Sequence, residues 1–231
     1  MMGVQRMLSA FLLLGVPAGT AVAQAVPSTI PSRVQGPERL ADLLVAEKDV
    51  IDTAAKNFDQ SFNAVIKARL ANSTAKPSPQ LMDAIRASGR RETMAILHEG
   101  YPELRRIVID RFRNGLTPSE IADANAFYAS PTGRRMNAAA TANAQGRGAE
   151  AIAQNMVDGV VGAMGPEDAP AIRAFGSTSA AAKMQTLSPQ LQQVSVNWAT
   201  NLMNANGARL QRATQAAAQT YLSAHRTRPA K

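Results

Sequence analysis

The sequence predicts an all-α protein, an antiparallel helical bundle of stacked helical hairpins with a degenerate internal repeat of about 48 residues. Three observations lead to this fold class. Apolar residues recur every three or four positions over most of the chain, and no segment alternates with period two. Prolines preceded by serine or threonine stand where helices are expected to begin. Aromatic residues make up only 4% of the chain, so small side chains and methionines must fill much of the core.

Residues 1–23 are predicted to be a secretory signal peptide. Arg6 precedes an apolar run over 7–16, and the small-residue site Ala21-Val22-Ala23 follows. The run is about half as long as a membrane-spanning helix requires, and no second long apolar run follows. We therefore expect cleavage near Ala23 or Ala25 and a soluble periplasmic or secreted product without a transmembrane segment.

The amino-acid composition limits which partners and which reactive groups the protein can have. The chain has no cysteine, which excludes disulfides, a lipid-anchoring thiol and a thiol nucleophile. Its net charge of +8 falls to +7 on cleavage, because Arg6 is the only charged residue in the segment removed. An anionic envelope polymer could meet such a surface, whereas nucleic acid is not expected for an exported protein. The arginine pairs lie in separate segments, which favours an ordinary solvated surface.

The mature chain begins with a predicted extended leader over 24–36, followed by one helical domain over 37–225. The first helix is expected from Glu38 to Leu70, with apolar residues at helical spacing. A break with two prolines over 72–79 opens a second helix that runs towards His98.

Gly100, Tyr101 and Pro102 are expected to interrupt that second helix. A further helical stretch over 103–113 then ends at Asn114 and Gly115, which form a C-terminal cap.

Residues 116–121, Leu-Thr-Pro-Ser-Glu-Ile, contain every element of a helix start. Thr117 can cap the helix, and Glu120 can reach back to the cap amide. Pro118 occupies the first helical position, where the N–H that proline lacks would have no partner within the helix. Leu116 can pack on Ile121 as a hydrophobic staple. A short helix to about Ala129 is therefore predicted.

The later helices are expected to begin in the same way. Ser130 and Pro131 should start a long alanine-rich helix that reaches towards Ala163. Ser188 and Pro189 should start a last helix to about Ala224, with Gly207 as a weak point, followed by a disordered basic tail over 226–231.

An internal repeat is suggested by the match of 116–136 with 164–184, without a gap, in a second copy over 164–203. Chance similarity is the alternative, because alanine-rich segments align easily. The matched pairs include Pro118 with Pro166, Glu120 with Asp168, Ala126 with Ala174, Phe127 with Phe175, Arg135 with Lys183 and Met136 with Met184, and upstream Asp110 with Asp158.

The segment from Leu116 to Met136 also resembles the bacterial family called domain of unknown function 2059. The resemblance lies in the Leu-Thr-Pro-Ser-Glu-Ile run, the Ala-Phe-Tyr triplet at 126–128 and the Ser-Pro-Thr-Gly-Arg-Arg-Met turn at 130–136, within a family-like core of about 81–156. It implies a helical exported protein of Gram-negative envelopes and no assigned activity. The matching residues are interpreted as structural: Leu116, Thr117, Pro118, Glu120, Phe127, Ser130, Pro131, Gly133 and Met136.

Three residues of this motif are candidates for binding. Tyr128, Arg134 and Arg135 place an aromatic ring beside two cations, which could form a ligand-binding surface. The favoured alternative is that Phe127 is a core ring and Tyr128 its half-exposed neighbour, because aromatic residues on a helix face usually pack.

The sequence gives little support for a metal site or for a catalytic nucleophile. The two histidines, His98 and His225, lack companions at metal-ligand spacing, so no metal or other cofactor is expected. The Ser-x-x-Lys pattern at Ser73 and Lys76 lies at a helix end without companion motifs.

Two classes of function remain. An envelope protein-binding module, of scaffold or chaperone-like type, is favoured because stacked hairpins form concave binding surfaces and because methionines such as Met82 and Met203 could line a groove. The alternative is a cell-wall-acting hydrolase or lytic enzyme with a buried glutamate as general acid, for which Glu99, Glu120 and Glu150 are nominal candidates. No catalytic residue is assigned.

Overall fold

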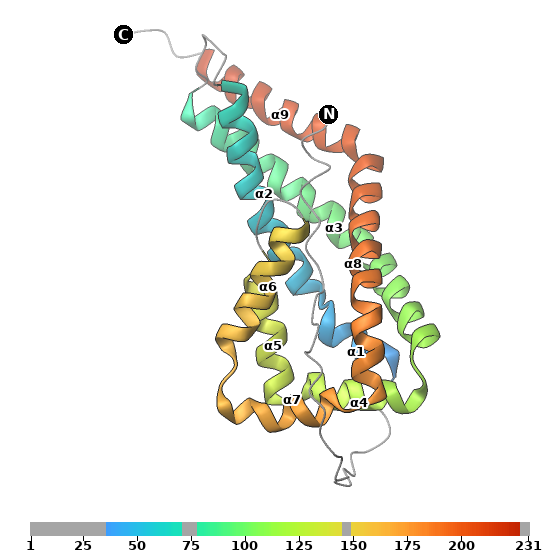
Figure 1. Ribbon diagram of the computed structural model, residues 1–231. Coiled ribbons are helices and arrows are strands. Elements are labelled where there is room, and N and C mark those ends of the chain that lie inside the picture. Colours follow the sequence, from blue (N-terminus) through green and yellow to red (C-terminus); the bar gives the residue numbers. More distant parts are fainter. Residues whose placement is uncertain (1–35, 71–77, 145–148, 227–231) are drawn as a thin grey trace. The chain divides into compact units, whose positions relative to one another are not determined.

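In a computed structural model, residues 36–70, 78–144 and 149–226 are described, and every element in these ranges is a helix (Figure 1). The all-α class is thereby confirmed. The predicted signal peptide, almost all of the leader, most of the break over 72–79 and the tail beyond Arg226 lie outside the described residues. In chain order the elements are α1 (Pro37–Leu44), α2 (Glu47–Leu70), α3 (Pro79–Gly115), α4 (Pro118–Ala129), α5 (Pro131–Ala142), α6 (Ala149–Ala163), the 3₁₀ helix η2 (Pro166–Asp168), α7 (Ala169–Gly176), α8 (Ser179–Ala205) and α9 (Gly207–Arg226).

The contacts group the described helices into two compact units. Unit 1 comprises residues 51–70, 78–100 and 199–226, and unit 2 comprises 36–50, 101–144 and 149–198. Helices α2, α3 and α8 each contribute residues to both units. The single helical domain over 37–225 stays a prediction.

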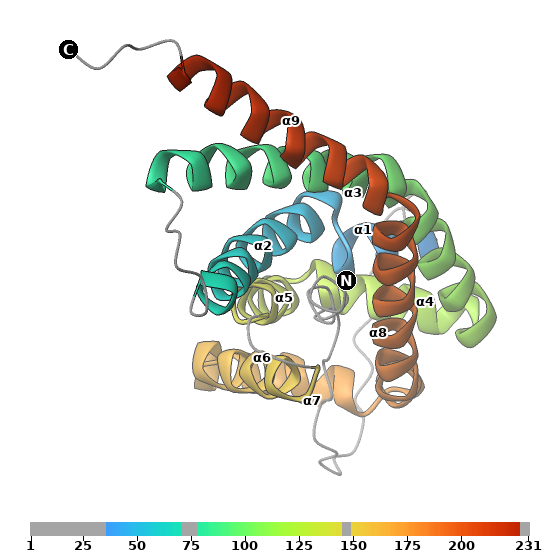
Figure 2. The same ribbon diagram turned by 90° about the horizontal axis from the view of Figure 1, so that it is seen from above.

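In unit 1, α9 lies along the first part of α3 (Figure 2). The Ser88 hydroxyl donates to the Ala213 carbonyl at 3.0 Å, and the Ser78 hydroxyl donates to the Tyr221 hydroxyl at 3.1 Å. Gly89 packs tightly beside Phe58 and Thr214, because a Cβ there would lie 3.2 Å and 3.3 Å from their side chains. Small residues thus bring the two helices close together.

In unit 2, α4 is the central element, since α1, α5 and α7 all pack against it. Helices α5 and α6 form a hairpin (Figures 1 and 2). The largest side chains that are under 2% exposed in this unit are Phe112, Leu40, Leu104, Leu191, Val45, Val50, Val108 and Asp168. All but Asp168 are apolar, so their burial stabilises the unit by the hydrophobic effect.

The single helix predicted over 38–70 is wrong, because the chain breaks at Val45 and Ala46 between α1 and α2. The Val45 side chain is 1% exposed, and its carbonyl accepts a hydrogen bond from the Tyr101 hydroxyl at 3.0 Å. This partner, 56 positions away, satisfies a backbone group that a continuous helix would have satisfied itself.

The predicted interruption at 100–102 is also wrong, since α3 runs without a break from Pro79 to Gly115 with Pro102 inside it. Pro102 cannot donate to the carbonyl four residues earlier. Contacts of the two residues before it offset that loss: Gly100 touches Leu202 so closely that a Cβ would lie 2.6 Å away, and Tyr101 is 7% exposed. Packing at this point outweighs the local cost of proline.

The long helix predicted from Pro131 towards Ala163 is instead the hairpin of α5 and α6. Asn143 ends α5, because its backbone amide and its side-chain amide both donate to the Ala139 carbonyl, at 3.1 Å and 2.8 Å. Gly159 of α6 meets this side chain, since a Cβ at Gly159 would lie 2.2 Å from the Asn143 Nδ2. The turn therefore depends on a contact between the two helices.

The last helix does not begin at Ser188 and Pro189 as predicted. Helix α8 begins at Ser179, where the Thr178 hydroxyl accepts from the Ala181 amide at 3.1 Å, and Pro189 lies inside the helix. The Ser188 hydroxyl donates to the Met184 carbonyl at 2.8 Å in the turn before that proline. The predicted weak point is confirmed, because α8 ends at Ala205 and α9 starts at Gly207.

Among the described helices, none is long and apolar enough to span a membrane.

Candidate functional site

The predicted helix start at residues 116–121 is confirmed. The Glu120 amide donates to the Thr117 hydroxyl at 3.4 Å, and the Glu120 carboxylate accepts from the Thr117 amide at 2.8 Å. The same carboxylate accepts a hydrogen bond from the Lys183 ammonium at 2.8 Å. Lys183 and the Thr117 amide together lower the pKa of Glu120 to about 2, so this side chain stays ionised.

Asp168 plays the matching role in the second half of unit 2. Its carboxylate is completely buried and accepts from the Gly165 amide at 3.1 Å and from the Thr132 hydroxyl at 2.7 Å. Arg135 forms an ion pair with the same carboxylate. The Thr132 hydrogen bond, with help from Gly165 and Arg135, holds the pKa of Asp168 below its usual range. A buried charge of this kind is tolerated because it is paired and hydrogen-bonded.

These contacts cross between the two segments that were aligned as a repeat. Glu120 of the first segment binds Lys183 of the second, and Asp168 of the second binds Arg135 of the first. The stacked rings of Phe127 and Phe175 complete the contact, with centroids 4.2 Å apart and planes inclined by 4°.

The turns after these rings are also alike. The Ser130 hydroxyl caps α5 by accepting from the Gly133 amide at 3.1 Å, as the Thr178 hydroxyl does for α8. Each hydroxyl donates to the carbonyl three residues earlier, on Phe127 and Phe175. The contacts follow the offset of the proposed repeat, which itself stays a prediction.

The three predicted binding residues do not share one exposed surface. Tyr128 is 3% exposed, not half-exposed as expected, and its ring packs edge-on against Phe127 and Phe175. Burial accordingly raises the pKa of its phenol. Arg135 is bound to Asp168. Only Arg134 is both exposed and without a polar partner among the residues that the structure describes.

Other motif residues have structural surroundings. A Cβ on Gly133 would lie 2.1 Å from the Phe127 carbonyl oxygen and 2.6 Å from the Tyr128 Cα, so α5 can start this close to α4 only with glycine there. Leu116 and Met136 are 5% and 4% exposed. These positions support the interpretation of the motif as a packed joint.

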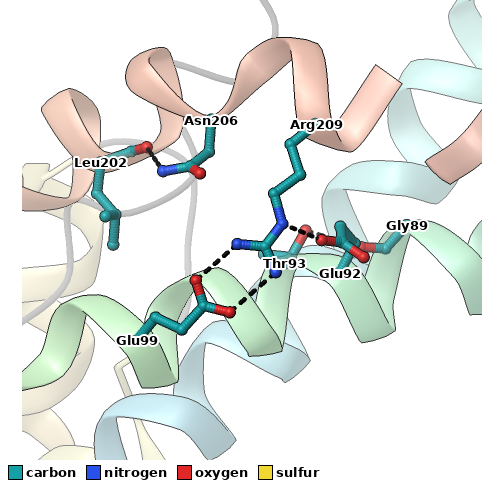
Figure 3. A network of polar contacts seen from close by, with 7 residues as sticks. All are labelled: Gly89, Glu92, Thr93, Glu99, Leu202, Asn206 and Arg209. Atoms are coloured by element: carbon teal, nitrogen blue, oxygen red, sulfur yellow. Dashed lines mark hydrogen bonds and ion pairs between the residues drawn. The ribbon is translucent and has the colours of Figure 1, made fainter. Parts of the chain in front are cut away.

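Glu99, a nominal general acid, is held in a charged network of unit 1 (Figure 3). The Arg209 side chain reaches from α9 to Glu92 and Glu99 on α3, and its Nη1 and Nη2 lie 2.6 Å and 2.9 Å from the two Glu99 oxygens. This bidentate pair lowers the pKa of Glu99. A proton donor would need the opposite shift.

The other nominal groups add no catalytic arrangement. The pKa of Glu120 is lowered as well, and the Glu150 side chain, like Ser73 and Lys76, lies outside the described residues. The His225 ring stacks on Tyr221 with centroids 4.0 Å apart. Within the described ranges, no three potential ligands gather to hold a metal ion.

A groove between α3 and α8 in unit 2 is a site that sequence reasoning missed. It measures about 370 Å³ and is lined by Arg106, Ile107, Asp110, Arg111, Asn114, Gly115, Leu187 and Gln190. We call it the α3–α8 groove. A Cβ on Gly115 would lie 2.8 Å from Leu187, so the two helices touch there.

The charges of the groove are unevenly paired. Asp110 is bound by Arg106 at 3.4 Å and by Arg113 at 3.0 Å. Arg111 is exposed, and its side chain has no ion pair or hydrogen bond in the described part of the chain. The signal available in the sequence was the spacing of residues 106, 107, 110, 111 and 114, which lie on one face of a helix.

Comparison with known proteins gives a family match over part of the chain. No curated protein and no solved structure matches the chain. A family model described as an uncharacterized protein conserved in bacteria (DUF2059) matches residues 102–158. This range contains the α3 side of the groove, all of α4 and α5, and most of α6. Residues 102–158 are thus similar to the DUF2059 family, and the resemblance in the motif from Leu116 to Met136 is confirmed.

Proposed function

We propose that this chain is an exported binding module of the bacterial envelope, of scaffold or chaperone-like type, which holds another protein through the α3–α8 groove. The observation that carries the proposal is the composition of the groove: the apolar residues Ile107 and Leu187 lie beside the unpaired cation Arg111. Ligand-binding sites usually combine an apolar surface with a few polar groups that fix the orientation of the ligand.

The groove lacks the groups that acid hydrolysis of a cell-wall polymer requires. Its one acidic lining residue, Asp110, is bound by two arginines. A general acid needs a carboxyl group whose pKa is raised, whereas the pKa values of Glu99 and Glu120 are lowered by their cationic partners. The binding role is therefore preferred to the hydrolase.

Export is supported by the sequence of residues 1–23, and a bacterial envelope is considered because the matching family is described as conserved in bacteria. In this proposal the product works in the periplasm or outside the cell, where a cysteine-free chain suffers no unwanted disulfide formation. An anionic polymer of the envelope is the other partner to consider, because the chain is basic.

The test is photo-crosslinking in living cells. A benzophenone amino acid replaces Asn114 or Gln190, both exposed lining residues of the groove. The full chain is expressed with its own predicted signal peptide. The matched control carries the same group at Arg173, an exposed position of α7 outside the groove. Adducts from envelope fractions are identified by mass spectrometry.

A discrete protein adduct from both groove positions, absent from the Arg173 control, is the expected result. Equal adducts at all three positions would mean that the groove is not the binding surface. If no groove position gives an adduct, the proposal fails, and assays with muropeptides and lipopolysaccharide become the next measurement.

A further inference from the structure

We infer that the α3–α8 groove receives the C-terminal end of a peptide and that Arg111 binds its terminal carboxylate. The inference rests on the proposed function and names the part of the partner that the groove recognises.

Arg111 is the group in the groove that is ready for an anion. It lines the groove, is exposed, and its side chain makes no hydrogen bond or ion pair to any residue in the described ranges. A guanidinium presents a planar fork of N–H donors that matches the two oxygens of a carboxylate. Binding a carboxylate at Arg111 therefore breaks no existing contact.

The nearby acidic group does not cancel this attraction. Asp110 already accepts from Arg106 and Arg113, and Arg113 also reaches Glu38 at 3.0 Å. Among the charged residues that line the groove, two are cations and one is an anion. The groove keeps a positive charge that complements a single carboxylate.

The remaining lining suits a short length of peptide. Ile107 and Leu187 offer an apolar contact next to Arg111, and the Asn114 and Gln190 amides are exposed donors and acceptors without partners in the described residues. A terminal residue carries its carboxylate and its side chain on one Cα, so both can reach neighbouring groups in a small site. At about 370 Å³ the groove lies at the small end of the range for ligand sites.

A phosphate would find less in the same site. A lipid headgroup or free phosphate uses several cations or backbone amides together, whereas here one unpaired arginine stands beside apolar side chains. The composition favours a carboxylate attached to an apolar residue.

The test compares two forms of one peptide library by fluorescence anisotropy. Fluorescein-labelled hexapeptides, randomised over their last three positions, carry either a free C-terminal carboxylate or a C-terminal amide. The protein is the full chain purified from the envelope fraction, as wild type, as Arg111→Gln and as the control Arg173→Gln. Arg173 is also an exposed arginine of unit 2 whose side chain has no polar partner among the described residues. Thermal unfolding confirms that each variant is folded.

The free-acid library is expected to bind roughly tenfold to a hundredfold more tightly than the amide, the usual range for a charge-assisted hydrogen bond. Arg111→Gln should remove this difference, and Arg173→Gln should keep it. Equal binding of acid and amide, or a difference that survives in Arg111→Gln, overturns the inference while crosslinks from the groove still support the proposed function.

A second assay with lipid vesicles distinguishes a carboxylate ligand from a phosphate ligand. Binding to phosphatidylglycerol vesicles that depends on Arg111, without preference for the free-acid peptide, overturns the inference in favour of a phosphate. If neither library binds, the inference fails, and the proposed function fails with it only when the groove positions also give no crosslink.

Discussion

The close approach at Gly133 gives the sharpest test of the structure. Replacing Gly133 with alanine would place a Cβ 2.1 Å from the Phe127 carbonyl oxygen, about 1.3 Å closer than the 3.4 Å at which ordinary contact begins. The Tyr128 Cα, at 2.6 Å, would also be too close. Both are backbone atoms, so no flexible side chain can move aside. The first turn of α5 must instead separate from the last turn of α4.

The expected loss follows from this geometry. Overpacking that side chains can absorb costs about 1–3 kcal/mol, and a clash with backbone belongs at the upper end. We expect Gly133→Ala to lower the free energy of unfolding by about 3 kcal/mol. For a chain of this size that corresponds to a fall in Tm of about 6–12 °C.

The matched control is Gly162→Ala in α6. A Cβ at Gly162 meets nothing within 4 Å, and alanine is the better helix former, so this variant should gain about 0.5 kcal/mol. Both variants are compared by urea unfolding followed by circular dichroism. If Gly133→Ala were as stable as the wild type, α4 and α5 could not approach each other as described, and the structural explanation of the Ser-Pro-Thr-Gly turn would be wrong.

Three further outcomes follow from unit 2, and each is measured by urea unfolding. Thr117→Ala should lose about 1 kcal/mol with the helix cap, and a loss no larger than that of Thr186→Ala, at an exposed threonine inside α8, would argue against the cap. Phe175→Ala, which removes a ring 5% exposed and stacked on Phe127, should lose about 3–5 kcal/mol, whereas Leu222→Ala, 45% exposed in unit 1, should lose well under 1 kcal/mol. The pKa of Glu120 is lowered from 4.5 to about 2, so its stabilising effect is complete above 4.5 and declines as the pH falls towards 2. Stability should therefore fall less between about pH 6 and pH 3 in Glu120→Gln than in the wild type, and equal losses would show that the pKa is not lowered.

The polar contacts of the motif could be predicted from the sequence only in part. The spacing of Thr117 and Glu120 predicted a capping box, and the structure contains it. The sequence could not indicate that Lys183 would reach the same carboxylate, or that Arg135 would be bound by Asp168. These partners lie 63 and 33 positions away, so no local pattern identifies them.

The α3–α8 groove could be predicted even less. Its α3 residues share one helix face, which the sequence contains, but Leu187 and Gln190 come from a helix whose start was predicted at the wrong residue. The unpaired state of Arg111 is equally invisible in sequence, because it depends on which acidic groups the fold brings near.

The sequence by itself determined the all-α class, the helix starts at Thr117 and Ser130 and the weak point at Gly207. These features depend on hydrogen bonds and backbone preferences within a few residues. Tertiary structure alone decided that the chain breaks at Val45 and continues through Pro102, since contacts of distant residues outweigh local propensity there. Burial and ion pairing are set by long-range packing, which explains why the structural motif could be predicted and the groove could not.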